Sequence, residues 1–425
     1  MKFIYNALAS LISNSNVISG LKRATFVTLS NNPSKAINAV LSATGEVSSI
    51  VYSEHLLSLF ENLEEKNKIK VLKNLVIHYD IDSDALIESV KKYSVDPSES
   101  AMNKITQLAE PAWVLLFRRL KATSEGTVRL VRLREHLLKA KKNDSDLGRL
   151  DVGLLGLFKT LFNPGFLVLQ PIDWSTPAAI LEKIIAYEAV HEIGSWEELR
   201  ARLAPEDRRC FAFFHLAMPD EPLIFVEVAL TDKIPDSIEK ILTDDREYLR
   251  EEDATTAVFY SISNCQDGLI GVSFGNFLLK QVIQRLKEEL PDLTTYVTLS
   301  PVPGFNKWLS QNNLELSDSL IKQKGVMPSI KLKKYLFEAM AEYLLISDRT
   351  DNAPNDPVAR FHLGNGATIG QFNFLGDVSE RGMRQSTGMM VNYIYELNTI
   401  EKNHEEYAKN NKIIASSNIR KLLKT

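Results

Sequence analysis

Apolar residues recur at intervals of three and four positions through residues 1–171, a spacing that predicts amphipathic helices. The segments His55–Tyr79, Leu130–Ala140 and Leu154–Phe162 follow this pattern most clearly. We interpret the moderately apolar N-terminal stretch as a first helix rather than a targeting segment, because it lacks a long apolar core and a small-residue cleavage site. No catalytic constellation is evident in this region, so the pattern indicates a helical packing or oligomerisation domain.

Short apolar runs alternate with amphipathic segments in residues 172–425. Asp173–Pro177 is typical of a helix start, with a capping hydroxyl and a proline at the first helical position. The runs Arg209–Met218 and Pro222–Leu230 flank a turn containing Pro and Asp, which predicts a β-hairpin. The other expected elements are helices at Ala178–Ala189, Trp196–Leu203, Ser237–Leu242, Ser273–Leu290 and Tyr335–Ile346, strands at Thr256–Ile262 and Thr295–Leu299, extended pieces within Phe361–Phe374, and a strand or helix at Met389–Leu397. This mixture indicates an α+β or mixed α/β domain.

Composition argues against several classes of partner and site. A net charge of -4 gives no basis for a nucleic acid partner, and no run approaches the roughly 20 apolar residues of a membrane span. Two cysteines, Cys210 and Cys265, argue against a disulfide scaffold and fit a reducing compartment, so we expect a cytoplasmic location. His191-Glu192 opens like a zinc protease motif, but no second histidine follows at the required spacing, so we expect no protein-bound metal.

A glycine-containing loop lies between the strand Thr256–Ile262 and the long amphipathic helix expected after it. Gly268 and Gly271 would allow the backbone to approach a ligand closely. Ser273 or Gly275 lies at the expected helix start, where free N–H groups favour an anion such as pyrophosphate. A glycine-bearing turn that merely packs is the alternative interpretation of the same residues.

Two polar residues stand at expected strand ends. Ser300 is followed by Pro-Val-Pro-Gly, and because proline lacks an N–H donor the chain must leave the sheet there. His362, between Phe361 and Leu363, is expected at a strand end beside a turn and has an ordinary pKa suited to proton transfer. The alternatives are a serine that bonds local backbone and a structural histidine. Tyr393 and Tyr395 offer two further phenols.

Six separated segments resemble the malonyl-CoA decarboxylase family in similar order and spacing across residues 172–420. The segments are ValPheTyrSerIleSer (258–263), GlyLeuIleGlyVal (268–272), LeuSerProValProGlyPhe (299–305), PheHisLeuGlyAsnGlyAla (361–367), AspValSerGluArgGly (377–382) and AsnTyrIleTyr (392–395). In the N-terminal half, the similarity lies in the helical pattern of apolar residues more than in any motif. Several motifs in register are far more specific than any one of them.

The resemblance implies an N-terminal helical oligomerisation domain, residues 1–171, and a mixed-sheet catalytic domain, residues 172–425, like the fold of GNAT acetyltransferases. In that fold a splayed sheet grips CoA, and the loop before the long helix binds its pyrophosphate. The acetyltransferase pattern Arg/Gln-x-x-Gly-x-Gly/Ala falls on residues 268–273, but the first and last positions depart from it. The resemblance to the decarboxylases is therefore the stronger one.

The resemblance also implies roles for individual residues. Ser300 and His362 take the catalytic positions, Tyr395 lies near the reacting thioester, and Asn365 is expected to hold the thioester oxygen. The residues expected to bind substrate are Gly268, Ile270, Gly271, Val272, Ser273, Phe274, Gly275 and Asn276. The implied partner is malonyl-CoA, with no separate cofactor and with a homo-oligomer, a dimer or tetramer, formed through the helical domain.

The chemistry fits these residue types. Loss of CO2 from malonyl-CoA leaves a thioester enolate, which needs an oriented carboxylate, a stabilised oxygen and a proton, but no metal. We expect Ser300 to orient the carboxylate and His362 to donate the proton. Two other functions remain open: a CoA-dependent acyltransferase on the same fold, for which no clear acidic base is evident, and a non-catalytic CoA-binding scaffold.

Overall fold

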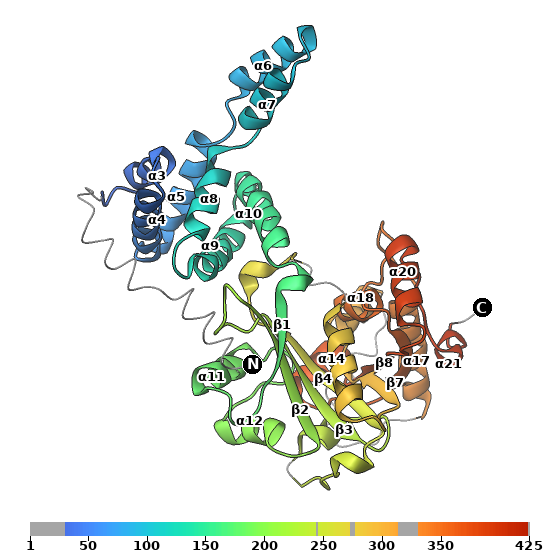
Figure 1. Cartoon of the computed structure of the whole chain (residues 1–425). Coiled ribbons are helices and arrows are strands. Elements are labelled where there is room, and N and C mark those ends of the chain that lie inside the picture. The colour runs from blue at the N-terminus through green and yellow to red at the C-terminus, as the bar shows by residue number, and fades with distance from the viewer. Residues whose placement is uncertain (1–29, 244, 273–276, 313–329, 424–425) are drawn as a thin grey trace. The chain divides into compact units, whose positions relative to one another are not determined.

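The computed structural model describes residues 30–243, 245–272, 277–312 and 330–423, and they fall into two compact units. Unit 1 contains the chain up to Leu167 together with the segments His215–Glu221 and Gln266–Ser273, and unit 2 contains the rest (Figure 1). The first helix expected near the N-terminus lies outside the described residues. Two later segments, one of them in the glycine loop, belong to the same unit as the N-terminal helices.

Unit 1 is helical, as the apolar spacing predicts. Its α-helices are α3 (Pro33–Ser42), α4 (Glu46–Glu61), α5 (Glu65–His78), α6 (Ser83–Val95), α7 (Glu99–Leu108), α8 (Ala112–Lys121), α9 (Gly126–Lys141) and α10 (Gly148–Leu161). The glycine loop contains the short 3-10 helix η4 (Asp267–Leu269). The segment His55–Tyr79 forms parts of two helices, α4 and α5, because the helical conformation is interrupted at residues 62–64.

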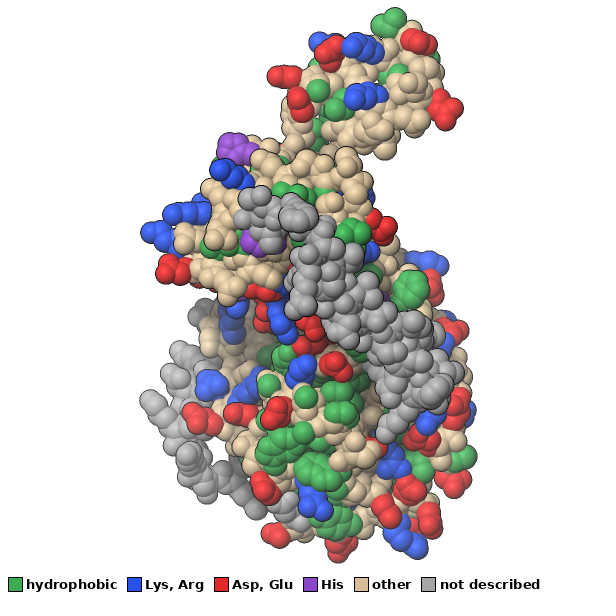
Figure 2. Space-filling view, turned by 60° about the vertical axis from the view of Figure 1, so that its left-hand side comes forward, with side chains coloured by type: hydrophobic (Ala, Val, Ile, Leu, Met, Phe, Trp, Pro, Cys, Tyr) green, Lys and Arg blue, Asp and Glu red, His purple; other side chains and the backbone are tan. Residues whose placement is uncertain are grey.

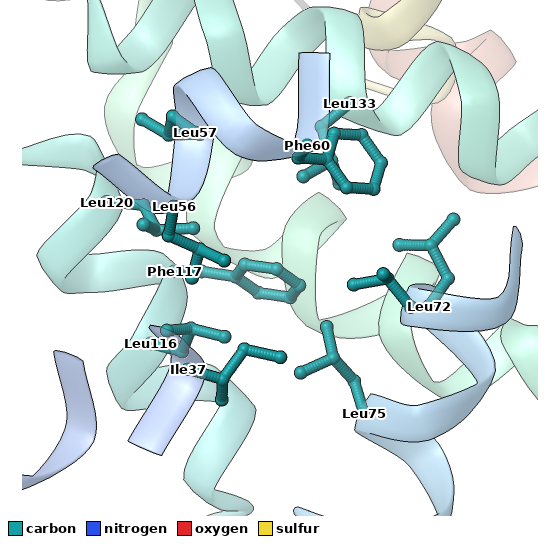
Figure 3. Close-up of a pocket in the computed structure, with 11 residues that line it drawn as sticks. Ile37, Leu56, Leu57, Phe60, Leu72, Leu75, Leu116, Phe117, Leu120 and Leu133 are labelled. Carbon is teal, nitrogen blue, oxygen red and sulfur yellow. The ribbon is translucent and has the colours of Figure 1, made fainter. Parts of the chain in front are cut away.

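The core of unit 1 is made of Leu and Phe side chains that point toward one another from α4, α5, α8 and α9 (Figure 3). A cavity of about 20 Å³ remains among them and is lined by apolar residues alone. A water molecule there would lack polar partners, so this void is a packing feature and not a ligand site.

The described residues of the sheet form eight strands, in the order β1-β2-β3-β4-β5-β8-β6, with β7 also paired to β8. The strands are β1 (Leu167–Pro171), β2 (Arg208–His215), β3 (Ile224–Thr231), β4 (Thr256–Asn264), β5 (Thr295–Thr298), β6 (Ser300–Pro301), β7 (Thr368–Asn373) and β8 (Met390–Ile394). The pair β2–β3 is the predicted antiparallel hairpin. The pair β4–β5 is parallel and is joined through α14 (Phe277–Glu289), so the sheet is mixed and the predicted α+β class is confirmed.

Most other predicted elements of unit 2 are present. Its remaining α-helices are α11 (Ala178–Tyr187), α12 (Trp196–Leu203), α13 (Glu239–Leu242), α15 (Phe305–Gln311), α17 (Ile330–Leu345), α18 (Pro357–Gly364), α19 (Glu380–Ser386), α20 (Ile400–Asn410) and α21 (Ser417–Arg420). Pro177 is the N-cap of α11 rather than its first residue. Met389–Leu397, predicted as either element, contains the strand β8.

The prediction of extended chain through Phe361–Phe374 is wrong in its first part. Residues 357–364 form α18, and only Thr368–Asn373 is a strand. The physical reason is a capping signal, since Asp356 accepts hydrogen bonds from the N–H groups of Val358 (2.8 Å) and Ala359 (2.9 Å). Pro357 at the first helical position completes the signal.

Strand β4 contains a β-bulge, and its pairing with β5 ends at Phe259. Its register with β3 passes from Glu227↔Ser261 to Val228↔Phe259, so Tyr260 is an extra, bulged residue. On its other side β4 pairs with β5 only through Thr256–Phe259. Within the described residues, no strand pairs with Tyr260–Asn264 on that side, which leaves a free strand edge.

The distribution of charged side chains on the surface agrees with the small net charge of the chain. On the face shown in Figure 2, acidic and basic side chains are interspersed and do not gather into one basic patch. None of the described helices has the length and apolar character needed to cross a membrane.

Candidate functional site

A pocket of about 240 Å³ in unit 2 is lined by the free part of β4, by β6 and by α18. Its lining residues are Val190, Phe259, Tyr260, Ile262, Asn264, Ser300, Pro301, Pro357, Val358, Phe361 and His362. No Lys, Arg, Asp or Glu is among these described lining residues. The pocket therefore offers mostly apolar walls with a few neutral hydrogen-bonding groups.

Ser300 and His362, 62 positions apart in the chain, meet in this pocket. The distance from Ser300 Oγ to His362 Nε2 is 3.0 Å, and both side chains are buried. Ser300 lies on β6, where it pairs with Val391 of β8. His362 lies in the last turn of α18, so its expected position at a strand end is wrong. The structure nevertheless brings the two predicted residues into hydrogen-bond contact.

Further hydrogen bonds continue the chain on both sides of the pair. Ser300 Oγ donates to Thr298 Oγ1 at 2.8 Å, and His362 Nδ1 lies 2.8 Å from the hydroxyl of Tyr395. Because the single proton of Ser300 goes to Thr298, Ser300 must accept from Nε2–H, and Nδ1 must accept from Tyr395. The network thus assigns His362 the tautomer with its proton on Nε2.

Burial makes this network electrically neutral. It lowers the pKa of His362 to about 3, because the imidazolium would have no water around it. It also raises the pKa of Tyr395 well above its ordinary value. At neutral pH, His362 is therefore an uncharged imidazole and Tyr395 a protonated phenol.

Two residues that support the pair were not singled out for these roles from the sequence. The Tyr393 ring stacks on His362, with ring centroids 4.4 Å apart, and so fixes the imidazole plane. Thr298 accepts from Ser300 and also from the backbone N–H of Tyr393 at 3.1 Å. The signal for Thr298 was available, since positions 298 and 300 lie on the same face of an extended chain.

Asn365 is not among the residues that line the pocket. It is the C-cap of α18, and its side-chain amide donates to the carbonyl oxygen of Phe361 at 2.7 Å. The structure thus gives Asn365 a capping role and does not bring it together with Ser300.

The described part of the predicted substrate loop, as far as Val272, lies in unit 1. Gly268 is buried against α9, and a Cβ there would lie 2.0 Å from the carbonyl oxygen of Val131. The close approach that needs this glycine is therefore to a helix. Gly271 needs glycine for another reason, its positive φ of 84°.

The remaining loop residues divide into two groups. Ile270 is exposed and Val272 is buried. Ser273, Phe274, Gly275 and Asn276 lie outside the described residues. Substrate binding by the loop stays a prediction.

Comparisons with known proteins agree along the chain. The family model described as malonyl-CoA decarboxylase C-terminal domain matches residues 165–425, and that of the N-terminal domain matches residues 79–162. The crystal structure of malonyl-CoA decarboxylase from Rhodopseudomonas palustris is 44% identical with a TM-score of 0.88, and covers 93% of this chain and 100% of its own. The enzyme of that name from Agrobacterium vitis is 45% identical with a TM-score of 0.86, and covers 92% of this chain and 100% of its own.

A curated relative from Anser anser anser, named malonyl-CoA decarboxylase, mitochondrial, is 36% identical over 358 residues. The match covers 75% of this chain and 71% of the relative. Because the C-terminal model alone spans more than half of the 425 residues, the chain belongs to the malonyl-CoA decarboxylase family.

Proposed function

We propose that the protein converts malonyl-CoA to acetyl-CoA and CO2 through Ser300 and His362. The observation that carries the proposal is the hydrogen bond between these side chains inside a pocket whose described lining residues include no charged one. The substrate follows from membership of the family.

The pocket walls favour loss of the carboxylate. A malonyl carboxylate placed there leaves water without gaining a cation among the described lining residues. Its charge then moves toward the thioester oxygen as neutral CO2 departs. Ser300 reorients its hydroxyl from Thr298 to the carboxylate and holds it in place for this step. An electrostatic environment of this kind acts on charge that develops during the reaction.

The proton for the α-carbon comes from a neutral relay. His362 gives its Nε2 proton to the enolate carbon while Tyr395 passes its hydroxyl proton to Nδ1. After the product leaves, water entering the pocket returns a proton to Nε2 and the Nδ1 proton goes back to the Tyr395 oxygen, which restores the starting tautomer, so the net reaction consumes one proton and releases one CO2. The hydrogen bonds on the two sides of His362 support this order of transfer.

We also propose that CoA lies along the free edge of β4. Extended ligands commonly bind unpaired strand edges through backbone hydrogen bonds, and Tyr260–Asn264 supplies such an edge.

The reaction needs no metal or separate cofactor in this proposal, because the thioester carbonyl accepts the electron pair. A homo-oligomer through the helical region is part of the same proposal. It is supported by α6 and α7, which pack side by side and leave Val90, Val95 and Met102 exposed (Figure 1). A cytoplasmic location stays a prediction, since the relative from Anser anser anser is named as mitochondrial.

One assay separates the candidate functions. Purified protein is incubated with malonyl-CoA, and acetyl-CoA and CO2 are followed with and without added amine. CO2 release without an amine is expected. Turnover that requires an amine would identify an acyltransferase instead, and CoA binding without any turnover would identify a scaffold.

A further inference from the structure

The pocket that contains Ser300 and His362 has one wall that comes from neither the sheet nor α18. Of the described lining residues, all but Val190 belong to β4, β6 or α18. Val190 lies between α11 and α12, in a segment without regular secondary structure, and it is half-buried. Such a segment would form a soft wall unless other groups held it in place.

Two N–H groups of this segment are bound by a single carboxylate. Glu188 Oε1 accepts hydrogen bonds from the N–H of Val190 at 2.8 Å and from that of His191 at 2.7 Å. The same carboxylate accepts from the hydroxyl of Ser261 at 2.8 Å and from that of Ser263 at 3.2 Å, both on β4. Glu188 therefore ties the segment to a strand that also lines the pocket.

The carbonyl groups of the segment are bound by two arginines. Arg381 Nη1 donates to the carbonyl oxygen of Val190 at 3.2 Å. Arg202 donates through Nη1 to the carbonyl oxygen of His191 at 2.8 Å and through Nη2 to that of Glu192 at 3.1 Å. Side chains thus bind the backbone on both sides of Val190.

Arg202 is in turn paired with a buried carboxylate. Its Nη1 donates to Glu227 Oε2 at 3.1 Å, and the two side chains are 8% and 0% exposed. Burying such a pair costs free energy, and replacing it with apolar side chains is often neutral or stabilising. Stability alone therefore explains this arrangement poorly, whereas a need to fix the pocket wall explains it.

A fixed apolar wall can discriminate between acyl groups by their size. In the proposed relay the α-carbon must reach Nε2 of His362, so the acyl group lies inside this pocket. An alkyl group on that carbon needs additional space, which close-packed and firmly held side chains do not give. One methylene in an apolar pocket changes kcat/KM by roughly 10–200-fold.

We propose that Val190 is a specificity-determining residue that favours an unbranched malonyl group over α-alkylmalonyl thioesters. The proposal rests on the proposed function and extends it by naming the residue that selects the acyl group. Glu188 is not among the described lining residues, so it acts as a positioning residue that holds Val190 through the backbone.

The test compares Val190→Ala with Val168→Ala. Val168 of β1 is a matched control, because it is another half-buried valine of unit 2 but is not among the described lining residues. For each full-length variant we would measure kcat/KM for CO2 release from malonyl-CoA and from methylmalonyl-CoA. The ratio of the two constants does not depend on the folded fraction, since both are measured on one preparation. Val190→Ala is expected to shift this ratio toward methylmalonyl-CoA about tenfold or more, and Val168→Ala to leave it unchanged.

Two further changes test the direction of the effect and the support of the wall. Val190→Ile enlarges the side chain and should shift the ratio toward malonyl-CoA. Glu188→Ala releases the N–H of Val190 and should shift the ratio toward methylmalonyl-CoA. Glu188→Gln keeps one acceptor oxygen and should recover part of the wild-type ratio.

An unchanged ratio in Val190→Ala, or an equal shift in Val168→Ala, would overturn the proposal. Should Val190→Ala not fold, an unchanged ratio in Val190→Ile would refute it. A wild-type ratio in Glu188→Ala would remove the positioning role of Glu188. If the wild-type protein releases no CO2 from malonyl-CoA, the proposed function fails, and the ratio of Kd for the two thioesters in the same variants still decides the role of Val190.

Discussion

Burial, and not the residue type alone, determines the charge of His362. An exposed histidine would be partly charged near neutrality, whereas burial lowers the pKa of His362 to about 3 and keeps it neutral. Its two ring nitrogens then have different partners, Ser300 and Tyr395. The proposed relay uses this asymmetry, with Nε2 giving a proton while Nδ1 receives one.

Replacing His362 with Ala should remove the proton donor and leave CoA binding intact. We expect kcat to fall roughly 10²–10⁴-fold, the usual contribution of a positioned acid. The control is His215→Asn, because His215 is also buried but bonds to the carbonyl of Leu161, away from the pocket lining. Turnover of the His362 variant within about tenfold of wild type would show that His362 is not the essential acid.

The pH dependence of kcat/KM should lack a break at the ordinary histidine pKa. His362 is neutral in the free protein at every pH well above 3, so its protonation state does not change between pH 5 and 8. We therefore expect kcat/KM to show no inflection near pH 6.5 attributable to this group. An acid limb centred near pH 6.5 that disappears in His362→Ala would contradict the neutral relay.

At the scale of elements, α18 and the loop Gln266–Val272 are each held in position by contacts with buried residues. Asp356, fully buried, caps α18 and also accepts a hydrogen bond from the hydroxyl of Tyr343 at 3.3 Å. The loop depends on α9 through Gly268 and Arg134.

Asp356→Ala should act on catalysis through the position of α18. Loss of the cap costs about 1 kcal/mol of stability, and His362 at the other end of the helix should shift relative to Ser300. We expect kcat to fall with little change in KM, measured beside the free energy of unfolding. Asp356→Asn keeps an acceptor and should recover part of kcat; equal losses in both variants would argue against the capping role.

Gly271→Val should weaken CoA binding, because a β-branched residue is strained at a φ of 84°. The control is Gly156→Val in α10, where a Cβ would meet no atom within 4 Å. Titration with free CoA measures the difference between the two variants. An unchanged affinity in Gly271→Val would remove this residue from the substrate site.

At the scale of the whole molecule, buried histidines make stability depend on pH. Burial lowers the pKa of His191 to about 4 and also lowers that of His215. With His362, these groups stay neutral in the folded chain at pH values where the unfolded chain binds protons. Glu227 opposes them, since burial raises its pKa to about 7 and the folded chain takes up that proton first.

The free energy of unfolding should therefore fall between pH 6.5 and 5. Each histidine proton bound only by the unfolded chain contributes up to about 1.4 kcal/mol per pH unit. Urea denaturation at the two pH values measures the slope. Glu227→Gln should steepen it, because it removes a proton that the folded chain binds first; a shallower slope in that variant would contradict the assignment.

The sequence alone determined the helical N-terminal region, the β2–β3 hairpin and the α+β class. These features depend on local periodicity and on turn chemistry within a few residues. The prediction that the chain leaves the sheet at Ser300 is wrong, because Ser300–Pro301 forms β6 and pairs with β8. The helix α18 was also signalled locally by Asp356-Pro357, although the glycines after His362 suggested extended chain. The family resemblance, carried by separated motifs, was enough to select Ser300, His362 and Tyr395 as candidate site residues.

Only the tertiary structure decided the protonation state of these groups and the packing of the loop. The neutrality of His362 comes from burial among residues distant in sequence, which no local pattern records. Gly268 suggested a ligand, but its neighbour is Val131 of α9, 137 positions earlier in the chain. Local sequence fixes which conformations a segment can adopt, whereas burial, charge and hydrogen-bond partners depend on segments that folding brings together.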